Sequence, residues 1–119
     1  MKVAIYARVS TNDQTVENQV RELREVADKM GAAEIKVFTD QGISGAKGRD
    51  KRPALDEMLK AVTRREIDKV MIWSVDRMGR STSDLVLILD EINQSGTDLY
   101  IHRNGIDTGT ASGKAMFGM

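Results

Sequence analysis

The chain of 119 residues contains no cysteine, so neither a disulfide framework nor a zinc site built on thiolates is open to it. Its single histidine, His102, has no partner at a metal-binding spacing. No apolar run approaches the roughly 18 residues of a membrane span, and the N-terminus lacks the features of a signal peptide. These absences predict a cytoplasmic protein that contacts no membrane and holds no metal ion.

The chain also lacks an excess of charge of either sign. Lysine and arginine number 18, as do aspartate and glutamate, so the net charge is zero. This balance argues against a free-standing DNA coat protein, whose basic excess would show in the total. It still leaves room for a local positive field in a site. Hydrophobic residues make up 40% of the chain, which is enough for one globular domain with a real core.

Strand and helix signals alternate along the chain. Short apolar runs predict strands over 3–10, 34–38, 69–73 and 98–101. Helices are expected between them, because apolar residues recur there at three- and four-residue spacing: Val16, Val20, Leu23, Ala27 and Met30; then Leu55, Met58, Leu59 and Val62; then Leu85, Leu89 and Ile92. Pro53 suits a helix start, Gly31 and Gly96 suit helix ends, and a further helix is expected from Ser112.

This alternation predicts an α/β fold for a single domain over residues 1–119. We expect a mostly parallel or mixed sheet of four to five strands, flanked by helices on both faces. No repeat, linker or low-complexity segment interrupts the pattern.

Arg8 and Ser10 stand at the end of the first predicted strand. Side chains alternate along a strand, so these two point to the same face. In open α/β sheets, ligands bind at the carboxyl ends of strands. A hydroxyl beside a guanidinium suits attack on a phosphodiester, because arginine stays charged and forks onto phosphate oxygens. The structural alternative is that Ser10 or Thr11 only caps the helix that follows.

A second charged group, Asp76-Arg77-Met78-Gly79-Arg80, follows the predicted strand that ends at Trp73. If this strand lies parallel to the first, both groups occupy the same edge of the sheet. Arg77 and Arg80 would face one way on a helical turn, and Gly79 would let the backbone approach a ligand. A solvated charged loop is the alternative, which weakens once the group is taken together with Arg8 and Ser10.

The segments Tyr6-Ala7-Arg8-Val9-Ser10-Thr11 and 76–80 resemble the two signature motifs of the serine recombinases, the resolvase/invertase family. The chain between them matches as well, at positions Gln14, Gln19, Asp40, Ser44-Gly45 and Arg52-Pro53, and so does the tail through Gly105-Ile106-Asp107-Thr108 and Gly113-Lys114-Ala115-Met116. The resemblance covers nearly the whole chain and implies a site-specific DNA recombinase catalytic domain.

The resemblance also implies a role for each matching residue. Ser10 matches the nucleophile that attacks a DNA phosphodiester and leaves a 5′-phosphoserine link. The remaining site residues are the arginines around the scissile phosphate, the acidic residue of the second motif and two supporting polar residues: Arg8, Arg52, Arg77, Arg80, Asp76, Gln14 and Gln19. The loop 42–51 is longer than in short resolvases and shifts the register of Arg52. Arginines supply the charge and phosphoserine conserves the bond energy, so no metal or cofactor is expected.

In this family a long dimerisation helix and a DNA-binding module follow the tail motif. The chain resembles a catalytic domain truncated before both. The implied partners are double-stranded DNA at a specific site and, in the full-length parent, further copies forming a dimer or tetramer, in the cytoplasm of a bacterium or archaeon at the nucleoid. Two alternatives stay open: a non-catalytic recombinase remnant that binds DNA or a partner, and a small phosphohydrolase or nucleotide-binding domain.

The remaining polar candidates have structural interpretations. His102 is expected to be a polar residue near a strand end. Asp40 and Asp107 are expected to cap turns rather than to bind a metal ion. Gly42, Gly45 and Gly48 do not form a phosphate-binding fingerprint, because no capped helix follows at the needed offset.

Overall fold

The computed structural model describes residues 1–9, 13–41, 53–73 and 82–110. These residues form a five-stranded sheet in the order β2-β1-β3-β4-β5. Strands β1 (Lys2–Val9), β2 (Glu34–Gln41), β3 (Lys69–Ile72) and β4 (Asp98–Ile101) run parallel, and β5 (Ile106–Asp107) is antiparallel to β4. The predicted α/β class and mixed sheet are confirmed. Three helices of the described chain cover the sheet, α1 (Asp13–Lys29), α2 (Pro53–Thr63) and α3 (Thr82–Gln94).

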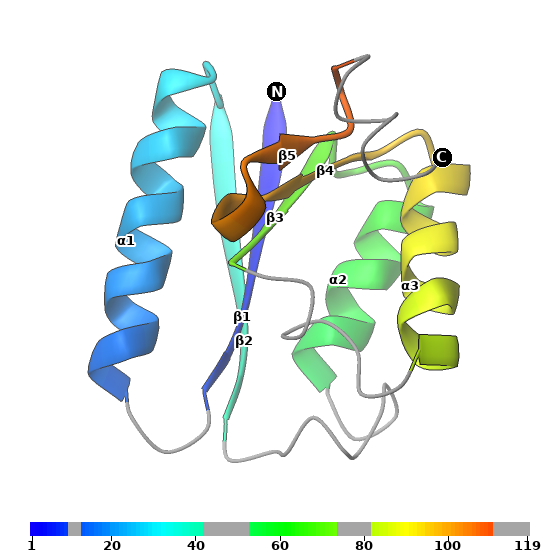
Figure 1. Cartoon of the computed structure of the whole chain (residues 1–119). Coiled ribbons are helices and arrows are strands. Elements are labelled where there is room, and N and C mark those ends of the chain that lie inside the picture. Colours follow the sequence, from blue (N-terminus) through cyan, green and yellow to red (C-terminus); the bar gives the residue numbers. More distant parts are fainter. Residues whose placement is uncertain (10–12, 42–52, 74–81, 111–119) are drawn as a thin grey trace.

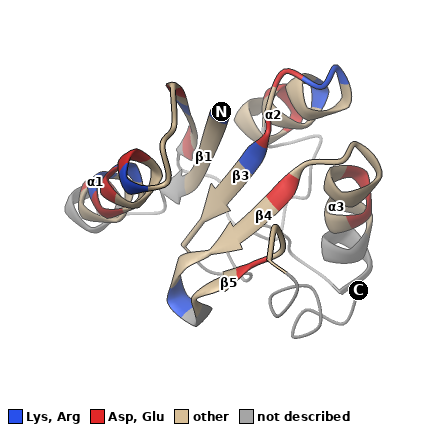
Figure 2. Cartoon of the chain, turned by 90° about the horizontal axis from the view of Figure 1, so that it is seen from above, with Lys and Arg blue, Asp and Glu red and all other residues tan. Residues whose placement is uncertain are grey.

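Helix α1 covers one face of the sheet (Figures 1 and 2). Its inward stripe is the predicted one: Leu23 and Ala27 are fully buried against Val3 and Ile5 of β1, and Val20 and Met30 are partly buried beside them. Val16 lies outside the residues whose side chains are described. The helix ends before Gly31, which adopts a φ of +86°, a conformation that glycine takes at little cost.

Helices α2 and α3 cover the opposite face of the sheet (Figures 1 and 2). All four predicted core residues of α2 are fully buried there: Leu55, Met58, Leu59 and Val62. On α3 the prediction was incomplete, because Ile88, which it omitted, is 1% exposed, whereas Leu89 is only partly buried. Ile92 is buried as predicted, and the side chain of Leu85 is outside the described set.

The two central strands are buried on both sides, as their near-continuous apolar sequence predicts. In β1, Val3 and Ile5 pack under α1, whereas Ala4 and Tyr6 pack under α2 and α3. Every residue of β3 is buried. Helices therefore cover both faces of β1 and β3, the two strands that precede residues 10–12 and 74–81.

The short strand β5 shows what the tail motif at 105–108 does. Gly105 turns the chain with a φ of +64° after the 3₁₀ turn at His102–Asn104. Thr108 then makes two hydrogen bonds to Leu99 of β4. Its hydroxyl accepts from the Leu99 N–H at 2.8 Å, and its own N–H donates to the Leu99 carbonyl at 2.9 Å. Asp107 accepts from the Gly109 N–H at 2.8 Å, which confirms it as a turn cap. It also receives the buried Lys69 ammonium at 2.6 Å, which ties β5 to β3.

The predicted helix from Ser112 lies outside the described residues. Within the described part of the chain, no helix is both long and apolar enough to cross a membrane.

Candidate active site

The two charged groups of the sequence follow, along the chain, two strands that lie side by side in the sheet. Strands β1 and β3 are hydrogen-bonded neighbours and run parallel, with Tyr6 opposite Ile72. The chain leaves β1 into residues 10–12 and leaves β3 into the segment that contains 76–80. The condition that the sequence prediction set is therefore met, because β1 and β3 are parallel (Figure 1). The positions of Ser10 and of residues 76–80 themselves lie outside the described residues.

The predicted site residues fall into three sets. Ser10, Arg52, Asp76, Arg77 and Arg80 lie outside the described residues. Arg8 and Gln14 lie in β1 and α1, but only their backbone positions are described; Arg8 pairs in register with Asp40 of β2. Gln19 is described in full and is 8% exposed on α1. The expected roles of all eight residues stay predictions. The structure describes the strands and helices that contain or adjoin these residues.

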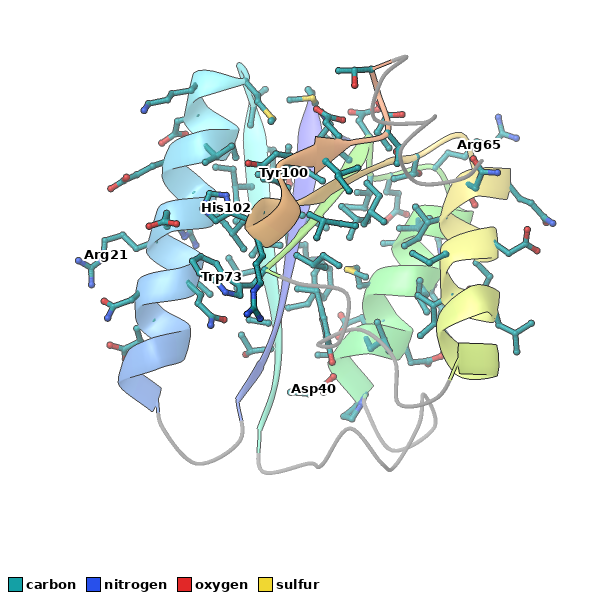
Figure 3. The ribbon with its side chains drawn as sticks, viewed as in Figure 1. Arg21, Asp40, Arg65, Trp73, Tyr100 and His102 are labelled. Atoms are coloured by element: carbon teal, nitrogen blue, oxygen red, sulfur yellow. The ribbon has the colours of Figure 1, made fainter. Side chains whose placement is uncertain are left out.

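Asp40 lies near the end of β2, at the carboxyl edge of the sheet, and is 2% exposed. Its carboxylate accepts three hydrogen bonds: from the Ala54 N–H at 2.8 Å, from the Leu55 N–H at 3.1 Å and from the Tyr6 hydroxyl at 2.8 Å. The first two donors belong to the first turn of α2. Asp40 was expected to cap a turn, whereas it caps the N-terminus of α2, a helix that is distant from it in the sequence (Figure 3).

The sequence around α2 explains why the cap comes from another strand. The residue before Pro53 is Arg52, whose guanidinium has no acceptor and cannot cap the helix. Pro53 itself has no N–H to satisfy. Asp40 supplies the missing acceptor, and Tyr6 holds it from β1. Two residues of the predicted motifs thus fix the start of α2, and Arg52 directly precedes that start in the chain.

Tyr6 carries a function that the sequence reasoning did not assign. It is 1% exposed, and its ring packs in the core under α2. A tyrosine inside a buried strand needs a partner for its hydroxyl, and that requirement was the available signal. The nearest acidic residue in the parallel neighbour strand, Asp40, satisfies it.

Replacing Asp40 with alanine is expected to lower the free energy of unfolding by roughly 2 to 4 kcal/mol, because the change removes a helix cap and leaves buried donors unpaired. Tyr6→Phe removes one of the three described hydrogen bonds to Asp40 and should cost about 1 kcal/mol. Urea unfolding followed by circular dichroism measures both values.

Asp90 is the matched control for this prediction. It lies on α3, is exposed and pairs only with the Gln94 amide in the described contacts, at 2.9 Å. Asp90→Ala should therefore change stability by less than about 0.5 kcal/mol. Equal effects of Asp40→Ala and Asp90→Ala would contradict the capping role.

His102 lies directly after β4, so its predicted place near a strand end is confirmed. Its two ring nitrogens contact Tyr100 of β4 and Glu22 of α1. No local pattern in the sequence predicts the Glu22 contact, because it joins residues far apart in the chain. Among the described residues no group of three or more histidine, aspartate and glutamate side chains is placed to hold a metal ion.

Comparisons with known proteins agree on one family. The chain matches the family described as "Resolvase, N terminal domain" over residues 3–119. It is 34% identical to the transposon Tn552 resolvase of Staphylococcus aureus over 119 residues, which are 98% of this chain and 54% of that protein. It is also 34% identical to the DNA-invertase hin of Salmonella typhimurium over 112 residues, 94% of this chain and 53% of that protein.

Solved structures give the same result. The N-terminal catalytic domain of TP901-1 integrase matches with a TM-score of 0.85 at 30% identity, covering 99% of this chain and 89% of that one. The C-terminal catalytic domain of ISC1926 TnpA, an IS607-like serine recombinase, matches with a TM-score of 0.74 at 29% identity, covering 86% of this chain and 70% of that one.

The fold and the strand-end arrangement are therefore those of a serine recombinase catalytic domain. The chain belongs to the resolvase family, and the resemblance seen in its sequence is confirmed. It spans about half the length of the curated relatives that it matches.

Proposed function

We propose that this domain cleaves and rejoins DNA at a specific site, with Ser10 as the nucleophile. The observation that carries the proposal is the parallel pairing of β1 with β3, which starts the Ser10 segment and the Asp76–Arg80 segment from adjacent strands at one sheet edge. Membership of the resolvase family supports the same chemistry.

In the proposed reaction, the Ser10 hydroxyl oxygen attacks the phosphorus of a DNA backbone phosphodiester. A bond forms between that oxygen and phosphorus, and the bond from phosphorus to the 3′ oxygen breaks. The serine loses its proton, and the departing 3′ oxygen gains one. Attack by a 3′ hydroxyl on the phosphoserine reverses these changes and restores Ser10. The bond energy is kept in the phosphoserine, so rejoining needs no nucleotide.

Phosphoryl transfer depends on positioning and on neutralising the charge of the phosphate. In this fold the N-terminus of α2 is not open for that purpose at Ala54 and Leu55, because Asp40 already accepts from both N–H groups. We therefore assign the charge stabilisation to the arginines, Arg8, Arg52, Arg77 and Arg80. Asp76 is proposed to orient an arginine or to move a proton, and Gln14 and Gln19 to support the site.

We assign the chemistry to this domain and do not assign it the choice of DNA site. Positive and negative residues are interspersed on α1 and α2 (Figure 2), α3 carries no lysine or arginine, and the net charge is zero. Phosphate contacts made by lysine and arginine supply most of the non-specific affinity for DNA. Site recognition and the assembly of a dimer or tetramer are proposed to use segments of the kind that the longer relatives carry beyond the matched region.

The covalent intermediate tests the proposal directly. The protein encoded by the longest natural reading frame that contains this chain would be incubated with DNA that carries its recombination site. A nick near the cleavage position lets the cleaved strand diffuse away. The expected product is a protein–DNA adduct that survives denaturation, and mass spectrometry should place the linked nucleotide on Ser10. DNA binding without any adduct would favour the alternative of a non-catalytic recombinase remnant.

Adduct formation should persist with the chelator EDTA in large excess over total divalent metal. The physical reason is that arginine guanidinium groups, which are always charged, replace the metal ion as the source of positive charge. The rate of adduct formation with and without EDTA is the measurement. A metal-dependent nuclease assayed in parallel provides the control for complete chelation. Full inhibition by EDTA that magnesium reverses would contradict the proposed mechanism.

A further inference from the structure

The only histidine of the chain connects three parts of the fold on the α1 side of the sheet (Figure 3). Its Nδ1 lies 3.0 Å from the Tyr100 hydroxyl of β4. Its Nε2 contacts the Glu22 carboxylate of α1. Its ring packs against Trp73, with the ring centroids 4.9 Å apart and the planes tilted by 46°. We call Glu22, Trp73, Tyr100 and His102 the His102 cluster.

The surroundings of Tyr100 keep its hydroxyl protonated. Burial raises the pKa of the Tyr100 hydroxyl above its ordinary value, and the negative charges of Asp107 and Glu22 raise it further. The hydroxyl therefore keeps its proton and can act as the donor to Nδ1. In the tautomer that carries its proton on Nε2, the ring accepts from Tyr100 and donates to Glu22. A protonated ring donates from both nitrogens, so the three side chains stay connected in either state.

The same segment holds the backbone of Trp73. The Arg103 N–H, next to His102, donates to the Trp73 carbonyl at 2.8 Å. Trp73 directly follows β3 and is the last described residue before the segment that contains Asp76, Arg77 and Arg80. Residues 102 and 103 thus fix both the side chain and the carbonyl of the residue from which that segment departs.

We propose that His102 is a positioning residue for the reaction: held by Glu22 and Tyr100, it fixes Trp73 and so the departure of segment 74–81 from the sheet. The proposal rests on the proposed function, in which Arg77 and Arg80 act on the phosphate. His102 itself touches no reacting atom in this scheme and acts only through Trp73.

Exposure of the cluster argues for a local effect rather than a contribution to global stability. The side chain of Glu22 is 51% exposed and that of His102 is 21% exposed. Partly exposed pairs of this kind add little to the free energy of folding. Since a misplacement of about 1 Å far from the chemistry can cost on the order of 10²-fold in rate, a weak local clamp can still have a large catalytic effect.

Hydrogen–deuterium exchange of the chain tests the positioning without any DNA. We expect peptides that cover 74–81 to exchange faster in His102→Ala and in Glu22→Ala than in the wild type. Glu22→Gln should restore the wild-type pattern, because its carboxamide oxygen still accepts from Nε2. The matched control is Glu25→Ala, an exposed glutamate on the same helix, which should have no effect. Unchanged exchange over 74–81 in both His102→Ala and Glu22→Ala would overturn the proposal.

Cleavage by the longest natural reading frame tests the link to the reaction. Under single-turnover conditions His102→Ala should slow adduct formation by about 10- to 100-fold while leaving DNA affinity and the urea midpoint near their wild-type values. Wild-type cleavage by His102→Ala would overturn the proposal and leave the proposed function intact. Absence of an adduct in the wild type would refute the proposed function, whereas the exchange experiment would still decide whether His102 orders the segment.

Discussion

Replacing Ser10 with alanine is expected to abolish the covalent protein–DNA adduct. The reason is that the methyl group of alanine offers no oxygen to form the bond to phosphorus. The measurement is the yield of the denaturation-resistant adduct on nicked site DNA, compared with DNA binding in a gel-shift assay. We expect binding to stay near the wild-type level, because one neutral hydroxyl contributes little to phosphate affinity.

Thr11 provides the matched control for Ser10, because it is the adjacent hydroxyl in the chain. Thr11→Ala should keep adduct formation within a few fold of the wild type. The same pair of variants tests the alternative in which this junction only caps a helix. Under that alternative both variants would lower the urea midpoint, and the adduct would persist in Ser10→Ala.

The frame of the candidate site could be predicted from the sequence because its signals are local. The apolar runs of β1 and β3 and the stripes of α1 and α2 each lie within one short segment. Parallel strands also follow from the alternation of strands with helices. The position of Arg8 near the end of β1 and the parallel pairing of β1 with β3 follow from those local patterns.

The rest of the structure depends on contacts that no local pattern shows. Strand β5 is too short to give a period, and it forms because Thr108 pairs with Leu99 and Asp107 receives Lys69. Ile88 lies next to Leu89 on α3, and the crossing of the helix over the sheet decides which of the two is fully buried.

The candidate site shows the same division between local and long-range signals. The sequence predicts that Asp40 caps a turn, whereas its partners, Tyr6 and the first turn of α2, come from two other elements. His102 was identified as a residue near a strand end, whereas its contact with Glu22 joins β4 to α1. Asp40 and His102 each connect elements whose periodic patterns are separate in the sequence. Asp40 contacts Ala54 and Leu55, close to Arg52 in the chain, and His102 contacts Trp73, which precedes the segment 74–81.

Arg77→Ala and Arg80→Ala are each expected to slow cleavage by on the order of 10²-fold or more, as when a pre-placed donor to a transition state is lost. The reason is that a guanidinium remains charged and donates two parallel hydrogen bonds to phosphate oxygens. Single-turnover rates of adduct formation measure the effect. Lysine at either position keeps the charge but loses the fork, so Arg77→Lys and Arg80→Lys should recover only part of the rate.

Thermal unfolding of the same variants separates charge stabilisation from folding. Charged side chains on a strand-end segment contribute little to the core, so the melting temperature should barely move. Arg21→Ala is the matched control, because Arg21 points outward from α1 and donates to the Asn18 side chain at 2.8 Å (Figure 3). It should change neither the rate nor the melting temperature. A large fall in melting temperature with cleavage retained in Arg77→Ala and Arg80→Ala would show that these arginines support the fold rather than the phosphate.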